Sequence, residues 1–530
     1  MKNRFAIFVT TVIFALLYPK ISALAATRTW DGGGTNSFWM NATNWDSDIA
    51  PLPGDDLVFP GGAAQLSAVN NFPAGTTFNS IIIGGAYSIS GQSIALNAGI
   101  RATNGTGTTI YNSLILNSNQ TFTLSVGSAN FFLPTAINLN GNDLTFSVGP
   151  QTIAQVQAVI GGVGGLIKTN TGALFMYASN SFNGPVQVFQ GSLSIYDGHA
   201  LGSTNANTTV AAGAFLSLAN SSITVVEPIV VSGTLSGGTV TLTAPLTLLG
   251  IYATIQVPSG ESFNINGVIS GDDGFTKIFP GILTLNSNNT YAGTTTINGG
   301  LLRVQGSQPG NPIVLNAGAL GGTGAVGNVT VSTPDLNVIA PGASPGILTC
   351  SNITLQSSTS VQVEIYGAAL GSDYDQLHVQ GTVALNNANL AINAIDFAMS
   401  GNAQFTLIDN DGSDPINGNF AGLPEGATVN VGTNQLKITY MGGTGNDVVL
   451  YQGNPPSRLT AITSATNGAK QILGMGLSNL TYTIQAVTNL NPPITWANLG
   501  PATADNSGVF SFIDTNAPLF PMRFYRAQSP

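Results

Sequence analysis

The amino-acid sequence predicts an all-β protein built as a solenoid, and two observations support this prediction. Short β-rich runs of four to eight residues recur along the whole chain, each bounded by Gly, Asn, Pro or Ser, while helical periodicity is nearly absent. Many runs alternate apolar and polar residues, as in Phe122 to Val126. In addition, residues 165–195 align without a gap on residues 274–304, at a constant offset of 109.

The internal repeat preserves apolar and turn positions and varies the polar ones. A unit that cannot bury its apolar face alone must stack on its neighbours, which is the organisation of a solenoid. The lysines occupy equivalent positions, so we expect them to have a structural task, such as solvating the edge of a coil. The shared positions are Gly165/Gly274, Lys168/Lys277, Gly172/Gly281, Leu174/Leu283, Asn180/Asn289, Gly184/Gly293, Gly191/Gly300 and Leu193/Leu302.

The first residues have the pattern of a secretory signal. Lys2 and Arg4 precede an apolar run at residues 5–18, and residues 23–25 form an A-x-A cleavage site. The apolar run is too short to cross a membrane as a helix. We therefore expect residues 1–25 to be a signal peptide. The mature protein should be extracellular or at the cell surface, without a transmembrane segment.

The composition excludes several classes of function. Charged residues make up 7% of 530 residues, the net charge is −10, and only four of the acids are Glu. The basic residues are scattered rather than clustered, so nucleic acid is not an expected partner. Cys350 is the single cysteine, which excludes an internal disulfide, and its strand-like surroundings predict a small buried hydrophobe.

The repeat pattern G-L-x-K-x-x-x-G-x-L-x-L-x-x-x-N-x-Y/F-x-G resembles the autotransporter-associated β-strand repeat of exported bacterial proteins. The tryptophan-marked segment 29–59, the later segments 319–349 and 373–392, and the phrase GGTGNDVVL are similar to other parts of the same family. The resemblance implies a right-handed parallel β-helix displayed outside the cell. Because few residues follow Leu450, we expect a passenger-like protein without a C-terminal autotransporter barrel.

These patterns divide the chain into four expected regions. Asn454 to Ser457 form a linker, and the short runs after it are spaced as in a small β-sandwich, with Tyr482 and Trp496 as its core aromatics. The regions are a signal peptide at 1–25, an N-terminal solenoid cap region at 26–150, a parallel β-helix at 151–453 with repeats at 159–195 and 268–304, and a C-terminal β-sandwich at 454–530.

Two stretches resemble calcium loops. GGTGNDVVL, Gly442 to Leu450, matches the nonapeptide G-G-x-G-x-D-x-U-x, but β-rolls bind calcium between consecutive turns and no second copy follows in tandem. We therefore predict a turn that closes the solenoid. DNDGSD, Asp409 to Asp414, lacks the spacing of an EF-hand loop, and we predict a hairpin turn there.

Motifs that could carry catalysis are also weak. GASPG at residues 342–346 matches G-x-S-x-G, but Pro345 has no N–H for an oxyanion hole and the flanks predict strands. His199 and His378 are too few for a histidine zinc site, and we expect His199 in a turn and His378 pointing outward from a strand. Asp373 and Asp375, expected on one strand face, are the best carboxylate pair for a glycosidase, although a turn and strand start is favoured.

The sequence therefore predicts an exported, non-enzymatic structural or adhesin-like β-helix protein with no catalytic, cofactor-binding or metal-binding residues. Surface glycans or neighbouring cell-envelope components are the expected partners, and the oligomeric state is open. The alternative is a carbohydrate-active enzyme or glycan-binding protein on the same scaffold. A buried carboxylate pair with a basic neighbour in a groove would favour the enzyme, and a row of exposed aromatics would favour sugar binding.

Overall fold

The computed structural model describes residues 25–529 apart from 104–106, 126–129, 252, 333–334, 398, 400–402, 413, 444, 454–456, 477–478 and 506–507. Except for Ala25, the predicted signal peptide lies outside the described residues, as does most of the predicted linker. The described chain contains no helix with the length and hydrophobicity needed to cross a membrane.

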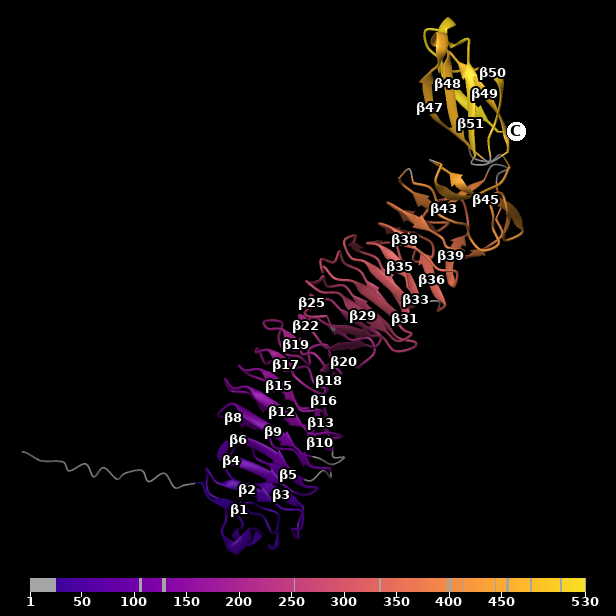
Figure 1. Ribbon diagram of the computed structural model, residues 1–530. Coiled ribbons are helices and arrows are strands. Elements are labelled where there is room, and N and C mark those ends of the chain that lie inside the picture. The colour runs from indigo at the N-terminus through magenta and orange to yellow at the C-terminus, as the bar shows by residue number, and fades with distance from the viewer. Residues whose placement is uncertain are drawn as a thin grey trace, which may run out of the picture.

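The chain forms a rod of stacked β-coils with a small module beyond its C-terminal end (Figure 1). A 15-stranded parallel sheet runs along the first half of the rod, from β1 (Thr27–Thr29) through β12 (Leu144–Val148) and β15 (Leu166–Thr169) to β28 (Ile269–Gly271). In this sheet Leu144 pairs with Leu166, and Leu166 with Val186. These coils therefore span 22 and 20 residues. The predicted all-β class and parallel solenoid are confirmed.

Alternation of side chains explains why these runs form coils. In β12, Leu144, Phe146 and Val148 are buried, while the residues between them face outward. Strand side chains alternate between faces, so each coil places its apolar set inside the rod and its hydroxyls outside. Phe146 pairs in register with Phe122 of the previous coil, and the rings meet edge to face at 5.7 Å. One apolar core follows the solenoid from Trp30 to Leu450.

A cluster of tryptophans closes the N-terminal end of the rod. Trp30, Trp39 and Trp45 are fully buried around Phe59, with ring centroids 5.3 to 6.3 Å apart. The Trp45 indole N–H donates to the carbonyl of Trp39 at 2.7 Å. The tryptophan-marked opening of the sequence thus shields the apolar end of the first coil, as a terminal cap of a solenoid must.

The two sequence repeats have the same internal pairing but lie on different faces of the solenoid. In the first copy β15 pairs with β17 (Val186–Val188), and in the second β29 (Phe275–Ile278) pairs with β31 (Thr295–Val304). Five parallel pairings lead from the second strand of copy one to the first strand of copy two. They run from β16 (Ala173–Met176) through β18 (Ser192–Ile195), β20 (Phe215–Leu218), β23 (Thr234–Gly237) and β26 (Thr254–Gln256) to β29. A residue of the second copy therefore lies five coils further along the rod than its counterpart in the first copy. It also lies on the next face of the solenoid, because each coil has strands on more than one face.

The end of the solenoid changes from parallel to antiparallel pairing. β43 (Gln404–Asn410) pairs in parallel with the preceding coil, whereas β46 (Asp447–Tyr451) pairs antiparallel with both β43 and β45 (Asn434–Gly442). Antiparallel strands at this end cover an edge that another parallel coil would otherwise occupy.

The C-terminal module contains two three-stranded antiparallel sheets that share a small core. They are β47 (Arg458–Ser464), β48 (Lys470–Met475) and β51 (Val509–Asp514), and β50 (Ala497–Thr503), β49 (Thr481–Val487) and β52 (Phe524–Gln528). Tyr482 is fully buried and stacks on Phe510 with centroids 4.8 Å apart. The prediction that Trp496 lies in this core is wrong. Its ring is partly exposed beneath the Arg526 guanidinium, which lies 4.5 Å from the ring centroid.

Candidate functional site

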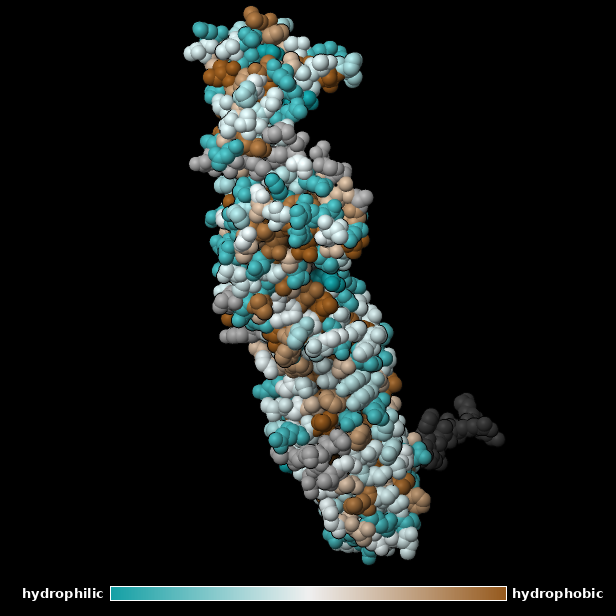
Figure 2. Space-filling view, turned by 90° about the vertical axis from the view of Figure 1, so that its right-hand side faces the viewer, coloured by the Kyte–Doolittle hydropathy of each residue, from teal (hydrophilic) through white to brown (hydrophobic). Residues whose placement is uncertain are grey.

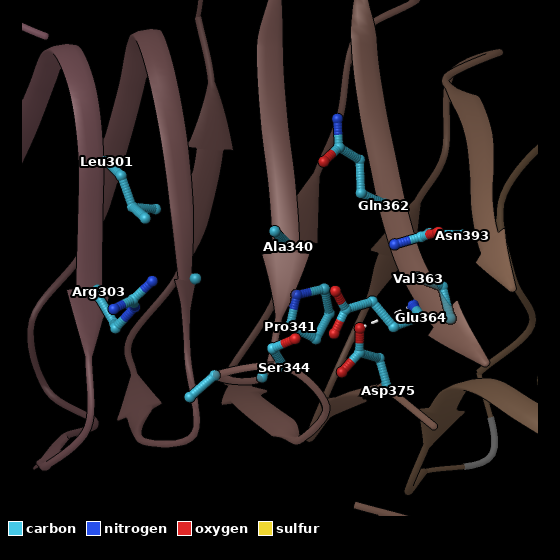
Figure 3. A pocket seen from close by; sticks show the side chains of 13 residues that line it. Leu301, Arg303, Ala340, Pro341, Ser344, Gln362, Val363, Glu364, Asp375 and Asn393 are labelled. Carbon is cyan, nitrogen blue, oxygen red and sulfur yellow. Dashed lines mark hydrogen bonds between the residues drawn. The ribbon is translucent and has the colours of Figure 1, made fainter. Parts of the chain in front are cut away.

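A polar groove crosses neighbouring strands near the C-terminal end of the solenoid. The register places Arg303 of β31 beside Gly321 of β33 (Ile313–Gly322) and Gly321 beside Ala340 of β36 (Asn337–Pro341). Gly321 has no side chain and Ala340 has only a methyl group, so the surface beside Arg303 is hollow at these two positions. The result is a cavity of about 190 Å³ (Figure 3).

Two carboxylates form one side of the groove. Glu364 lies on β39 (Thr359–Ile365), and Asp375 immediately precedes β40 (Gln376–Val379). Asp375 is 2% exposed, and its carboxylate accepts hydrogen bonds from the backbone N–H groups of Gly346 at 2.7 Å and Glu364 at 2.8 Å. Figure 3 shows the side chains of Glu364, Asp375 and Ser344 together at this side.

Burial makes Asp375 a carboxyl that titrates near neutral pH. Desolvation raises the pKa of Asp375 to about 6, although its two backbone donors lower it, and the charge of Glu364 adds to the rise. One oxygen of Glu364 is also buried and has no hydrogen-bond partner among the described residues. The pair can therefore exchange a proton or accept hydrogen bonds from hydroxyl or ammonium groups.

Arg303 forms the opposite side of the groove (Figure 3). Three strand spacings separate β31 from β39, which is roughly 14 Å at the usual spacing. Direct pairing of Arg303 with Glu364 is thus excluded, and Arg303 has no ion-pair or hydrogen-bond partner within the described part of the chain. The groove places a cation and two carboxylates on opposite sides of a floor of small residues.

The predicted carboxylate pair is not the pair that the structure brings together. Asp373 and Asp375, the best carboxylate pair in the sequence, both precede β40 and contact different neighbours, so they do not share a strand face. The turn and strand start that the sequence favoured for them is confirmed. The Asp373 carboxylate accepts from the backbone N–H of Ala369 at 3.1 Å, within its own turn. Sequence reasoning missed Arg303 and Glu364, since only the register of separate coils unites them with Asp375.

The histidines and the serine motif lie as the sequence suggested. His378 points outward from β40 and pairs with Asp409 on the neighbouring strand, at 2.8 Å from Nδ1 to Oδ2. His199 is exposed in a turn beside Asp197. Residues 342–346 connect two strands, β36 and β37 (Ile347–Cys350), which is not the strand-to-helix turn of a hydrolase elbow.

The predicted closing turn at GGTGNDVVL is confirmed. Gly442 ends β45 and pairs with Asp447, the first residue of the antiparallel strand β46. The Asp447 carboxylate accepts from the backbone N–H of Asn410 at 3.0 Å. By contrast, the hairpin predicted for DNDGSD is wrong, because Asp409 and Asn410 end β43 and the next strand does not pair with it. Ser413 lies outside the described residues.

Lys168 and Lys277 have a structural role, but they do not solvate the edge of a coil. They are 1% and 0% exposed. The Lys168 ammonium donates to the carbonyls of Thr169, Asn170 and Gln190 at 2.7 to 3.1 Å. The Lys277 ammonium donates to those of Phe279 and Gly299. Burial lowers the pKa of both ammonium groups to about 8.

Cys350 is fully buried, in agreement with its prediction as a core residue, and burial raises the pKa of its thiol to about 12.

Comparison with known proteins identifies the repeat. The family model named passenger-associated-transport-repeat matches residues 166–195 and 275–304, which lie within the two repeats found in the sequence. The adhesin BmaC autotransporter of Brucella suis biovar 1 (strain 1330) is 28% identical over 185 residues, 34% of this chain and 4% of that protein. The extracellular serine protease of Serratia marcescens is 40% identical over 80 residues, 15% of this chain and 8% of that protein.

The chain thus spans less than a tenth of the length of either relative. Among solved structures, the Haemophilus influenzae Hap adhesin has a TM-score of 0.34 and 13% identity, covering 77% of this chain and 65% of that chain, which is too slight a likeness to bear on the fold. The match to the repeat family is specific and falls on the coils where Lys168 and Lys277 are buried. The predicted repeat is therefore confirmed: this chain is a β-solenoid that carries two passenger-associated-transport repeats.

Proposed function

We propose that the chain is an exported, adhesin-like structural protein that acts as a stiff display rod on the outside of the cell. The observation that carries this proposal is the pair of passenger-associated-transport repeats, built as coils of one continuous solenoid. One of the similar proteins is named as an autotransporter adhesin, which supports the same reading.

The outer surface of the rod suits weak contact at many points. Charged residues are few, and outward positions are filled largely by hydroxyl and amide side chains, which form ladders between coils. Examples are the side-chain hydrogen bonds from Asn286 to Asn266 and from Asn316 to Asn298. Figure 2 shows hydrophilic and hydrophobic residues interspersed over one face of the rod. Such a surface offers many hydrogen bonds without strong electrostatic steering.

Surface exposure and cell attachment provide the test. Intact cells that produce the protein are treated with protease, and the chain is followed with antibodies against the solenoid. We expect its loss from intact cells and weaker attachment of a deletion strain to surfaces or neighbouring cells. Protection of the whole chain until the cells are lysed would contradict the proposal, as would normal attachment of the deletion strain.

The groove supports a second candidate function, a carbohydrate-active enzyme. Glu364 and Asp375 offer a carboxylate pair, with Arg303 on the opposite side of the same groove, and the pKa of Asp375 suits a general acid. Release of reducing ends from polysaccharides by residues 26–530, lost in both Glu364→Gln and Asp375→Asn, would establish it. Absence of release by the unsubstituted protein would leave the display function alone.

A further inference from the structure

An aromatic cluster lies on the outer surface of the first repeat. Tyr177, which follows β16, and Tyr196, which follows β18, stack with ring centroids 4.5 Å apart and planes at 15°. Phe175 meets both rings edge to face, at 6.5 and 5.9 Å. All three side chains are partly exposed, whereas their chain neighbours Leu174, Met176 and Ile195 are buried in the core.

The repeat does not need this cluster in order to fold. At the offset of 109, the second repeat has Thr284, Asn286 and Gln305 where the first has Phe175, Tyr177 and Tyr196. Both copies nevertheless make the same strand pairings, bury the same lysine and use the same asparagine between coils. The chain thus contains an internal comparison in which polar residues replace the rings and the coil is unchanged.

The stacked tyrosines belong to a row of residues at equivalent positions on successive coils, and the positions that follow Tyr196 in this row have small side chains. Backbone hydrogen bonds from coil to coil align Tyr177, Tyr196, Ala219 and Gly238, whose N–H groups donate to Val156, Met176, Ile195 and Leu218. Neighbouring strands are about 4.8 Å apart, close to the spacing of stacked rings. The Tyr196 face that turns away from Tyr177 therefore has only Ala219 and Gly238 on the next two coils, and no side chain continues the stack.

Polar groups surround this free face. Asn220 is exposed, and its amide donates to the carbonyl of Tyr196 at 2.9 Å. Asp197 is the next residue after Tyr196, and one oxygen of its carboxylate accepts from the backbone N–H of His199 at 2.8 Å. A Glu261 carboxylate oxygen lies 3.5 Å from where a Cβ on Gly238 would stand. No Lys or Arg occurs between Lys168 and Lys277, and these two are buried on carbonyls. The surroundings offer hydrogen-bond acceptors and amides but no lysine or arginine, and the nearby His199 lies beside the Asp197 carboxylate, so an anionic ligand is disfavoured.

We propose that Tyr196, supported by Tyr177 and Phe175, is a binding platform for a neutral pyranose sugar of an extracellular glycan. The apolar C–H face of a pyranose would pack on the Tyr196 ring above Ala219, in the position of the next ring of the stack. Its hydroxyls would bond to Asn220 and to the carboxylates of Asp197 and Glu261. A protein partner would bury a larger apolar patch than this one, whose rings stand among polar residues. The inference rests on the proposed function, since it names the ligand class of the adhesin.

The test is electrophoresis of purified residues 26–530 through native gels containing soluble polysaccharides. The neutral probes are galactomannan, xyloglucan, laminarin and pullulan, and the anionic probes are pectin and alginate. We expect at least one neutral polysaccharide to retard the protein and the Kd to rise at least tenfold in Tyr196→Gln. Phe175→Thr and Tyr177→Asn should weaken binding less. These substitutions are the residues of the second repeat, so the coil should keep its thermal stability.

Phe189→Asn is the matched control. Phe189 is an exposed aromatic of the same repeat outside the stack, and the second repeat has Asn298 at its position. Binding should be unchanged in this variant. No retardation by any neutral probe, equal binding by Tyr196→Gln, or equal loss in Phe189→Asn would each overturn the proposal. If no neutral probe retards the unsubstituted protein while cells that produce it still attach better than the deletion strain, the platform is refuted and the adhesin function stands.

Discussion

At the scale of single residues, Glu227 is the ionisable group whose burial has the clearest consequence. It is 2% exposed, accepts a hydrogen bond from the Thr208 hydroxyl at 2.7 Å, and has a second oxygen without a partner among the described residues. Desolvation raises its pKa from about 4.5 to about 8, although the Thr208 bond lowers it. The folded protein therefore holds this proton between these two pH values, where the unfolded chain releases it.

This linkage predicts that the protein loses stability as the pH rises from 5 to 8. The folded state binds more protons over that range, so the free energy of unfolding falls with pH. Glu227→Gln should remove the part of this dependence that Glu227 contributes, while Asp375, whose pKa is also raised, keeps its own share. The variant should be more stable than the parent at pH 8.5 by about 1 to 3 kcal/mol. Urea unfolding at pH 5 and 8.5 measures the difference, with Glu261→Gln as a partly exposed control. An equal stability difference at both pH values would refute it.

The buried lysines lead to a second prediction at this scale. Lys168→Met or Lys277→Met keeps the aliphatic stem but leaves turn carbonyls without a donor, which should lower the free energy of unfolding by about 1–3 kcal/mol each. The two sites are five coils apart, so the losses should add in the double variant to within about 0.5 kcal/mol. Lys437→Met, on an exposed side chain, should be neutral. Neutral behaviour of Lys168→Met would show that the carbonyl contacts contribute nothing.

At the scale of the structural element, one asparagine in each repeat joins three coils. Asn180 accepts from the backbone N–H of Ile160 at 2.8 Å and donates to the carbonyl of Ala200. Asn289 accepts equivalently from Ile269, but its amide donates to the side chain of Gln308. In both copies the asparagine side chain accepts a hydrogen bond from a backbone N–H group. The amide of Asn180 donates to a backbone carbonyl, whereas the amide of Asn289 donates to a side chain.

This difference predicts unequal costs for the same substitution. Asn180→Ala leaves two buried backbone groups without partners, at about 1–3 kcal/mol each, whereas Asn289→Ala leaves one together with a side chain that can reorient. Asn180→Ala should therefore be the more destabilising variant in urea unfolding. Hydrogen exchange should quicken at the Ile160 amide in one and at the Ile269 amide in the other. A larger loss for Asn289→Ala would contradict this account of the contacts.

Local pattern predicted the elements, and coil geometry decided what the pattern could not. Alternation as in residues 122–126 predicted strands, and the offset of 109 predicted a repeated unit. The second copy lies on a different face of the solenoid from the first. This placement depends on the lengths of the coils between the copies, and an alignment of the two repeats does not give those lengths. Arg303, Glu364 and Asp375 form one groove only through the register of separate coils. From the sequence, Lys168 is expected on the surface. The carbonyl groups that bind its ammonium come together only in the folded chain, so the sequence pattern does not show them.

At the scale of the whole molecule, the rod behaves as a one-dimensional stack in which each coil contacts only its neighbours. Stability in such an array is approximately a sum of coil and interface contributions, so the ends matter more than in a globular domain. The N-terminal end depends on buried tryptophans, and the C-terminal end on the antiparallel strands β45 and β46. Disruption at one end should therefore propagate inward over a limited number of coils.

Trp45→Ala tests this view directly. Trp45 is fully buried, with Trp30, Trp39 and Phe59 at 5.3, 6.3 and 5.8 Å, and its loss should cost about 3–5 kcal/mol at that end. Because interface contributions are local, hydrogen exchange should show lost protection in the first coils, around β1 and β2 (Asp56–Phe59), and retained protection from β15 onward. Trp496→Ala, in the C-terminal module, should leave the solenoid unchanged. Uniform loss of protection along the rod in Trp45→Ala would instead mean that all coils unfold as one cooperative unit, and the end cap would then stabilise the binding surfaces far from it.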